Sequence, residues 1–321
     1  MPIEQSLYSS LSYGVEMEMT GETREKSAQI LAEYFERDYS HTGGVYDKYT
    51  VTDAECRVWS VMFDGSITPL RHSGNRLVAA GDEYKVEFVT PPLIGGQSID
   101  MLQEVIRKLR RAGFVVSETC GLHIHVGIKE LETNAIIHLL NQIHSKQSLL
   151  FKALGVDSCS RRYRYCRKIP TELVENIKRK KPQTLSELAD VWYDTLSFRG
   201  GRYEHYDKSR YHIVNLTRCL VPDSRFYIGT VEFRCFSGTM HAGKVRAYIQ
   251  FCLLLIQYCA GISKSSYKPV EVRVSESEAY KLRCFFLKIG CIGNEFKTMR
   301  LHWLERFGKQ SKAWRRGDMI N

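Results

Sequence analysis

The chain has 321 residues, of which 43% are hydrophobic and 26% are charged, and this composition excludes the disordered, collagen-like and fibrous classes. Its formal charge is +10, and the excess lies in two stretches: residues 157–210 hold 13 basic and 8 acidic side chains, and residues 297–321 hold 7 and 2. Such stretches attract nucleic acid, anionic substrates or membrane surfaces, or they form solvated basic surface.

Hydrophobic periodicity predicts the elements of the first half of the chain. In chain order we expect a strand at 12–19, a helix at 23–37, a loop at 43–53, strands at 58–63 and 85–89 separated by turns, a helix at 99–111, a strand at 122–128, and a helix at 133–154 capped by Thr133.

The second half begins with a basic, tyrosine-rich segment that predicts helices near 173–180 and 185–196. Strands at 211–217 and 229–236 follow, and then helices at 243–259, 275–289 and 296–307. No GxGxxG or Walker A glycine loop is present. The fold class predicted is therefore α+β, an antiparallel sheet backed by helices.

The cysteines and the longest uncharged stretch predict the cellular location of the protein. Ten cysteines are scattered without a CxxC pair, and the chain does not start with a secretory signal. These features predict reduced thiols and a cytoplasmic location. The uncharged stretch 247–263 is too short and too polar for a membrane span, so we expect a buried helix there.

Four of the predicted strands carry ionisable side chains two residues apart, so that both members of a pair lie on one face of the strand. The pairs are Glu16 and Glu18, Lys85 and Glu87, His123 and His125, and Glu232 and Arg234. The residues between them are apolar and can pack on helices. We expect a sheet with one apolar face and one face that gathers carboxylates, imidazoles and a guanidinium.

Carboxylates on neighbouring strands repel one another unless cations lie between them. Mg²⁺ and Mn²⁺ prefer oxygen ligands, and Mn²⁺ also accepts imidazole. Two such ions can bridge nucleotide phosphates without a glycine loop. A solvated polar face explains any single strand, but Glu, His and Arg recurring in four strands favour a metal site.

Six short motifs in order give the sequence a specific resemblance. They are Gly14–Glu18, Trp59 with Asp64–Ile67, Glu87–Pro92, Gly121–Val126, Arg210–Leu216 and Thr230–Arg234. Together they resemble the carboxylate–amine ligase superfamily, which includes glutamine synthetase and the glutamate–cysteine ligases, and within it the amidoligase family. The resemblance covers about residues 11–260.

The resemblance implies a glutamine synthetase-like catalytic fold, a curved antiparallel sheet with a polar concave face backed by helices. Residues 1–260 would form the catalytic domain, with a basic insert at about 155–208. Residues 261–321 would form a helical extension packed on it.

The same resemblance implies metal ligands by position. Glu16, His123 and Glu232 would hold one ion. Glu18 would hold a second ion with a carboxylate from the middle strands, for which Glu87 is a better candidate than Asp64.

The resemblance also implies which residues would contact the substrates. Arg234 would face the transferring phosphoryl group, and His125 would lie near the phosphates or the acyl phosphate. Arg210 and Asn215 would contact the nucleotide or the substrate. Asp64 is a candidate for the group that takes the proton of the amine.

The implied reaction is ATP-dependent formation of an amide or isopeptide bond with Mg²⁺ or Mn²⁺. A carboxylate substrate attacks the terminal phosphorus of ATP, and an amine substrate then displaces phosphate from the acyl phosphate. Two alternatives stay open: a phosphotransferase on the same fold, and a protein that binds nucleic acid or another anionic polymer.

The basic insert bears on the choice of substrate. It alternates arginines with tyrosines, namely Arg161, Arg162, Tyr163, Arg164, Tyr165 and Arg167. This pattern suits an acidic peptide or polymer, nucleic acid through phosphate contacts and stacking, or simply a surface loop.

Overall fold

A computed structural model describes residues 9–129, 131–156, 165–271 and 277–307. The chain divides into two compact units, each built from separate stretches. The N-terminal unit comprises Ser9–His125 and Phe236–Arg246, and the C-terminal unit comprises Val126–Cys235 and the described chain from Ala247 onward. The division predicted from the resemblance remains a prediction. It consists of a catalytic domain at residues 1–260 with a basic insert, followed by a helical extension.

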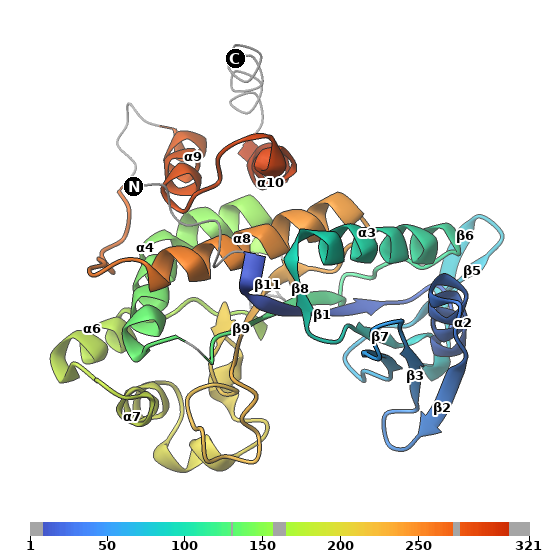
Figure 1. The fold of residues 1–321 in the computed structure, drawn as a ribbon, viewed down its shortest axis with the longest axis horizontal. Helices are drawn as coiled ribbons and strands as arrows, with labels where there is room; N and C mark the ends of the chain where they lie inside the picture. The colour runs from blue at the N-terminus through green and yellow to red at the C-terminus, as the bar shows by residue number, and fades with distance from the viewer. Residues whose placement is uncertain (1–8, 130, 157–164, 272–276, 308–321) are drawn as a thin grey trace. The chain divides into compact units, whose positions relative to one another are not determined.

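A large antiparallel sheet forms the N-terminal unit, as the alternating pattern predicts (Figure 1). Its neighbouring strands are, in order, β1 (Ser12–Met19), β7 (Val86–Val89), β4 (Val58–Met62), β3 (Lys48–Thr52) and β2 (Tyr39–Gly43). β8 (Leu93–Ile94) pairs with the start of β1, and β9 (Gly121–Gly127) lies on the other side of β1.

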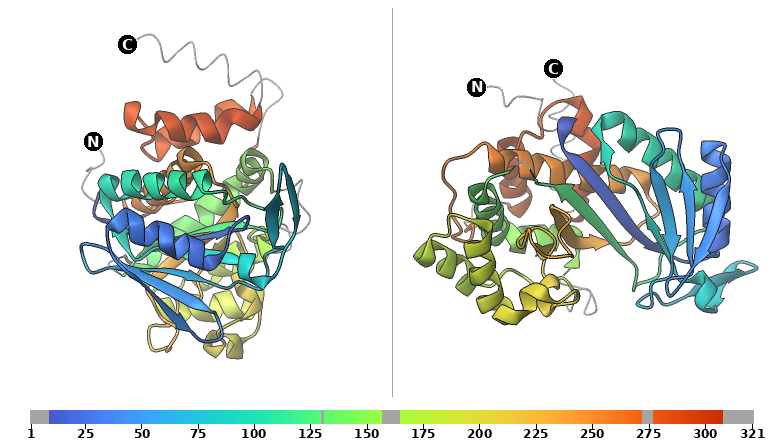
Figure 2. Two further views of the ribbon diagram at one scale, coloured as in Figure 1. Left: turned by 90° about the vertical axis from the view of Figure 1, so that its right-hand side faces the viewer. Right: turned by 60° about the horizontal axis from the view of Figure 1, so that its bottom comes forward.

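Helices cover one face of this sheet (Figure 2). α2 (Arg24–Phe35) contacts β3, β4 and α3 (Gly95–Arg111). The Phe35 ring lies 5.0 Å from the Trp59 ring, which lies 5.8 Å from Phe88. Phe88 is directly opposite Met17 of β1. These apolar residues therefore face the helices, and the residues that alternate with them face away.

A separate hairpin joins β5 (Leu70–Ser73) to β6 (Arg76–Ala79). Ser73 pairs with Arg76, so Gly74 and Asn75 form a two-residue turn in which Gly74 has φ +59°. Glycine adopts this backbone conformation without a Cβ clash, which explains the turn that the sequence signals at this position.

The C-terminal unit is mainly helical. Its elements are α4 (Thr133–Leu154), α6 (Thr171–Lys180), α7 (Leu185–Leu196), β10 (Val214–Asn215), β11 (Thr230–Ser237), α8 (Ala242–Ala260), α9 (Glu278–Lys288) and α10 (Lys297–Leu304), of which β11 and α8 also supply residues to the N-terminal unit. Trp303 of α10 anchors the core, with ring distances of 4.3 Å to Phe251 and 5.7 Å to Phe286.

Short 3-10 helices complete the secondary structure: η1 (Asp82–Tyr84), η3 (Arg199–Tyr203), η4 (Lys208–Arg210), η5 (Asn294–Phe296) and η6 (Glu305–Phe307). Among the described helices, none combines the length and the apolar character that crossing a bilayer requires. Of the stretch 247–263 that was predicted as a buried helix, residues 247–259 are buried within α8, whereas the helix ends at Ala260 and residues 261–263 lie beyond it with more exposure.

Three local predictions are wrong. The predicted loop at 43–53 is instead the hairpin of β2 and β3, because β-branched and aromatic residues at 49–52 pair with both neighbouring strands. Only Val214–Asn215 of the predicted strand 211–217 is a strand. Thr133 is the first residue of α4 and not its cap; the cap is Glu132, whose side chain makes no capping hydrogen bond.

Candidate active site

Glu16 lies between two histidines in the N-terminal unit. Because side chains alternate along β1 and β9, Glu16, His123 and His125 leave the apolar core and meet on the polar face. The Glu16 carboxylate lies 3.2 Å from His123 Nδ1 and 3.0 Å from His125 Nε2. Burial would raise the pKa of Glu16, but the two imidazoles outweigh it and hold this pKa well below its usual value. Glu16 is therefore a carboxylate at neutral pH.

Two further carboxylates lie on the same face as this group. Glu18 of β1 is directly opposite Glu87 of β7, so the two side chains point to the same face of the sheet. Glu18 is only 6% exposed, and one of its oxygens accepts a hydrogen bond of 2.6 Å from the backbone N–H of Gly121. The polar face predicted from the sequence thus brings Glu16, Glu18, Glu87, His123 and His125 onto three neighbouring strands.

Gly121 permits the close approach of two of these groups. A Cβ at this position would lie 3.1 Å from His123 Nε2 and 3.3 and 3.4 Å from the two carboxylate oxygens of Glu18. The imidazole and the carboxylate therefore converge on the space that a side chain would fill. Glycine is needed here for room, since its φ is not positive.

Asp64 begins a turn just after β4. Its carboxylate accepts a hydrogen bond of 2.6 Å from the backbone N–H of Ser66. Two residues later, the N–H of Thr68 donates to Thr119, which lies just before β9. The loop of Asp64 is thus tied to the loop that leads into the histidine strand.

Thr90 is a positioning residue that sequence reasoning did not single out. Its hydroxyl accepts a hydrogen bond of 3.0 Å from the N–H of Val15, the neighbour of Glu16. Thr90 is 7% exposed. The signal that could have found it is its place between the Glu87 strand and the two prolines that end that strand.

The C-terminal unit holds a second polar group on β10 and β11. Asn215 is directly opposite Glu232, and its amide donates a hydrogen bond of 2.7 Å to the Glu232 carboxylate. Arg234, two residues along the same face, forms an ion pair with the other carboxylate oxygen. All three side chains are largely buried, so the charges of Glu232 and Arg234 are removed from water together as a hydrogen-bonded pair.

Arg210 lies among aromatic side chains and other arginines of the same unit. Its guanidinium carbon is 5.2 Å from the ring centroid of Tyr206 and 5.8 Å from that of Tyr211. Burial and the charges of Arg218, Arg210 and Arg225 lower the pKa of His205, which accepts a hydrogen bond of 3.0 Å from Arg218. Among the described residues, none of these three arginines pairs with a carboxylate, so the cluster suits an anionic group.

Most of the arginine–tyrosine pattern lies outside the described residues, namely Arg161, Arg162, Tyr163 and Arg164. Arg167 is described, and it donates to the backbone carbonyls of Tyr211 and Lys208 at 3.2 and 2.9 Å. This arginine therefore fastens one loop of the C-terminal unit to another.

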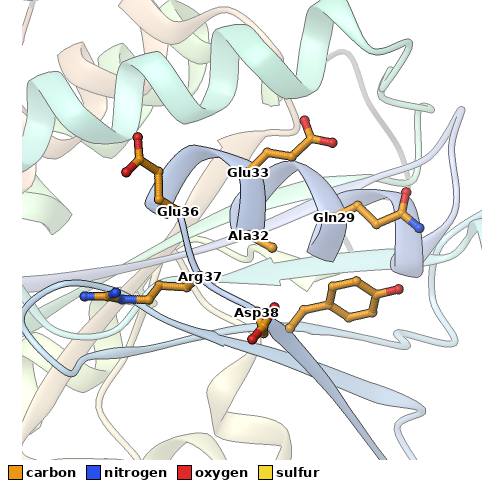
Figure 3. A pocket seen from close by; sticks show the side chains of 7 residues that line it. Gln29, Ala32, Glu33, Glu36, Arg37 and Asp38 are labelled. Carbon is orange, nitrogen blue, oxygen red and sulfur yellow. The ribbon is translucent and has the colours of Figure 1, made fainter.

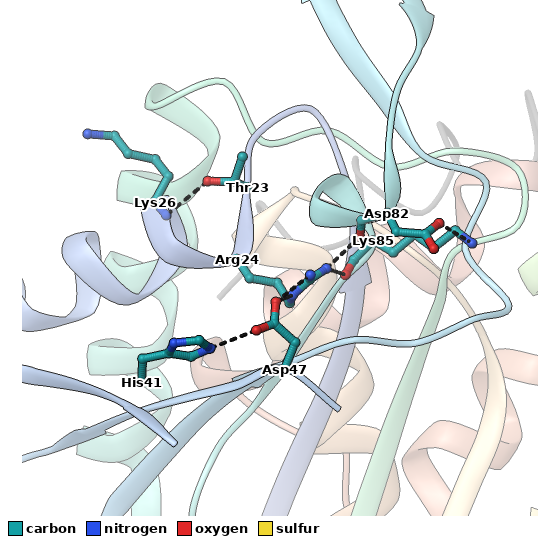
Figure 4. A network of polar contacts seen from close by, with 7 residues as sticks. All are labelled: Thr23, Arg24, Lys26, His41, Asp47, Asp82 and Lys85. Carbon is teal, nitrogen blue, oxygen red and sulfur yellow. Dashed lines mark hydrogen bonds and ion pairs between the residues drawn. The ribbon is translucent and has the colours of Figure 1, made fainter. Parts of the chain in front are cut away.

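Two other polar regions of the N-terminal unit have structural explanations. Arg24 joins Asp47 of the β2–β3 turn to the carbonyls of Asp82 and Lys85, which fixes that turn against the start of β7 (Figure 4). An open groove of 530 Å³ runs along α2 and mixes acidic side chains such as Glu33 with Arg37 (Figure 3). Neither region contains a group that points to a ligand.

Comparison with known proteins places the sequence in a family. The model of a family described as "Putative amidoligase enzyme" matches residues 9–256. No curated protein matches the chain. Among solved structures, a bifunctional glutathione synthetase from Pasteurella multocida is similar at 12% identity and a TM-score of 0.40, over 97% of this chain and 50% of that one. The chain thus spans about half the length of that protein.

Proposed function

We propose a function from one premise: the chain belongs to the amidoligase enzyme family. It is accordingly an amide-bond-forming ligase. We infer that it joins a carboxylate and an amine at the expense of ATP, through an acyl phosphate. The observation that carries this proposal is the group formed by Glu16, His123 and His125, because these side chains meet on the polar strand face within the matched residues 9–256.

The donor atoms fit divalent cations. Carboxylate oxygens and an imidazole nitrogen are ligands that Mg²⁺ and Mn²⁺ accept. We propose that Glu16 and His123 hold one such ion. Glu232 stays a third ligand that is predicted from the sequence alone. The facing carboxylates of Glu18 and Glu87 suit a second ion, since two like charges across a strand pair are otherwise destabilising. The ions would neutralise the phosphates and lower the repulsion between two anionic substrates.

The protein groups around the phosphates would then have separate roles. Arg234 would stabilise charge on the transferring phosphoryl group, and His125 would lie beside the acyl phosphate. The hydrogen bond from Asn215 to Glu232 makes Asn215 a positioning residue for that carboxylate. Arg210 would contact the nucleotide, with Tyr206 as a stacking surface. Asp64 remains the proposed acceptor of the amine proton.

Hydroxylamine trapping tests the proposed chemistry. With ATP, Mg²⁺ and a panel of amino acids and glutamate-rich peptides, an acyl phosphate reacts with hydroxylamine to give a hydroxamate. We expect hydroxamate and ADP in equal amounts. ADP with a phosphorylated product and no hydroxamate would instead identify a phosphotransferase.

Glu16→Gln and Glu232→Gln should each lower hydroxamate formation roughly 100-fold or more, because each removes a carboxylate that is expected to hold a divalent ion. Glu33→Gln is the matched control, since Glu33 is exposed on α2. Activity retained in both test variants would reject the assigned residues.

A further inference from the structure

A pocket of 630 Å³ lies within the C-terminal unit and shares no residue with the proposed active site. Three walls enclose it: one face of α4, the end of α6 with the residues that follow it, and the segment 263–268 after α8. The pocket therefore combines stretches that are far apart in the sequence.

Hydrogen bonds fix these walls to one another. His144 of α4 contacts the carbonyl of Tyr267 at 2.6 Å and the hydroxyl of Thr171, the first residue of α6, at 3.2 Å. The N–H of Val270 donates to the carbonyl of Ser145 at 2.8 Å. The pocket is thus a built feature of the unit.

Polar groups of α4 contribute to the lining. The hydroxyl of Ser265 lies 2.7 Å from His138 Nδ1 and accepts a hydrogen bond of 3.0 Å from the amide of Asn141. Asn141 Oδ1 is buried and has no hydrogen-bond partner in the described part of the chain. This oxygen only accepts hydrogen bonds, so a ligand that meets it must offer a donor such as a hydroxyl group.

The charged side chains of the lining all have the same sign. They are Lys178, Lys181, Lys264 and Lys268, and the lining includes no aspartate or glutamate. None of the four forms an ion pair with a described residue. The first turn of α4 also reaches the pocket at Asn134, and the side chain of its cap residue, Glu132, makes no capping hydrogen bond. Lysines and a helix N-terminus both favour an anion.

We propose that this pocket binds a small phosphorylated ligand. Lysine acts as a point charge that binds phosphate oxygens. Arginine, whose fork binds carboxylate and phosphate alike, is absent from the lining. The proposal is independent of the ligase function and concerns a second site on the same chain.

Inorganic tripolyphosphate in EDTA is a suitable probe, because removal of metal suppresses binding at the proposed active site. Calorimetry of the full chain should show binding that weakens as salt is raised. Lys178→Gln should lower the affinity roughly fivefold, as expected for one partly screened charge. Lys180→Gln is the control, since Lys180 lies on the same helix, outside the pocket, and pairs with Asp194 at 3.3 Å. Glu16→Gln should bind as the wild type does.

Acetylation of lysines in the wild-type chain, read by mass spectrometry, gives a test that needs no variant. Tripolyphosphate should protect Lys178, Lys181, Lys264 and Lys268 but not Lys180. Equal effects on Lys178 and Lys180 in either experiment would show a non-specific basic surface and overturn the proposal. Tighter binding of citrate than of tripolyphosphate would overturn the phosphate assignment.

Discussion

At the scale of single residues, the proposed site depends on side chains that are held before any ligand arrives. Burial would raise the pKa of Glu16, but His123 and His125 hold it well below its usual value, and Glu18 is fixed by the N–H of Gly121. Preorganised groups of this kind need no rearrangement during the reaction. Residues that only make room for them should therefore matter as much as the groups themselves.

Gly121→Ala tests this reasoning. The added Cβ would press on His123 and Glu18 by a few tenths of an ångström, and we expect the affinity for Mn²⁺ to fall about 10-fold to 100-fold, as it does when groups that support metal ligands are disturbed. Gly96→Ala is the matched control, because a Cβ there meets nothing within 4 Å. Titration with Mn²⁺ and a thermal melt measure affinity and stability together; an unchanged affinity in Gly121→Ala would contradict the account.

At the scale of elements, the turn between β3 and β4 is held by one buried carboxylate. Asp53 accepts hydrogen bonds from the N–H groups of Glu55 and Arg57, from Arg57 Nε at 2.8 Å and from Trp59 Nε1 at 2.9 Å. Burial would raise its pKa, but these donors outweigh burial and lower it. This turn fixes Trp59, on which α2 packs through Phe35.

Asp53→Asn should lower the free energy of unfolding by about 2 kcal/mol at neutral pH, because hydrogen bonds to a charged acceptor are lost. The folded-state pKa lies below the unfolded value of about 4, so this stabilisation is complete above that value and disappears as the pH falls through the folded-state pKa. Urea titrations at pH 7 and pH 3 should therefore show a smaller difference between variant and wild type at pH 3. An equal difference at both values would mean that the charge of Asp53 does not stabilise the turn.

The sequence predicted elements whose pattern repeats and missed those whose stability depends on neighbours. β1, β7, β9 and β11 were predicted because apolar and ionisable residues alternate strictly along them. The hairpin of β2 and β3 was missed because only one of its strand residues is buried and its two glycines indicate a loop. Its pairing becomes favourable only through β4, which no local pattern shows.

At the scale of the whole molecule, the sequence predicted a polar sheet face but not the division into two units. The residues singled out from the sequence fall in both units: Glu16, Glu18, Glu87, His123 and His125 in one, and Glu232, Arg234, Asn215 and Arg210 in the other. Contacts between distant stretches define these units, so periodicity along the chain cannot reveal them. The lysine pocket was also missed, since its walls come from three separate segments.

The central claim is that Glu16 and His123, on neighbouring strands of the N-terminal unit, hold a divalent ion. Electron paramagnetic resonance of Mn²⁺ titrated into the wild type, Glu16→Gln and His123→Gln measures it most directly. We expect the wild type to bind Mn²⁺ and each variant to lose at least about 10-fold in affinity while it keeps its melting temperature within a few degrees. Binding as tight as the wild type in either folded variant would contradict the claim.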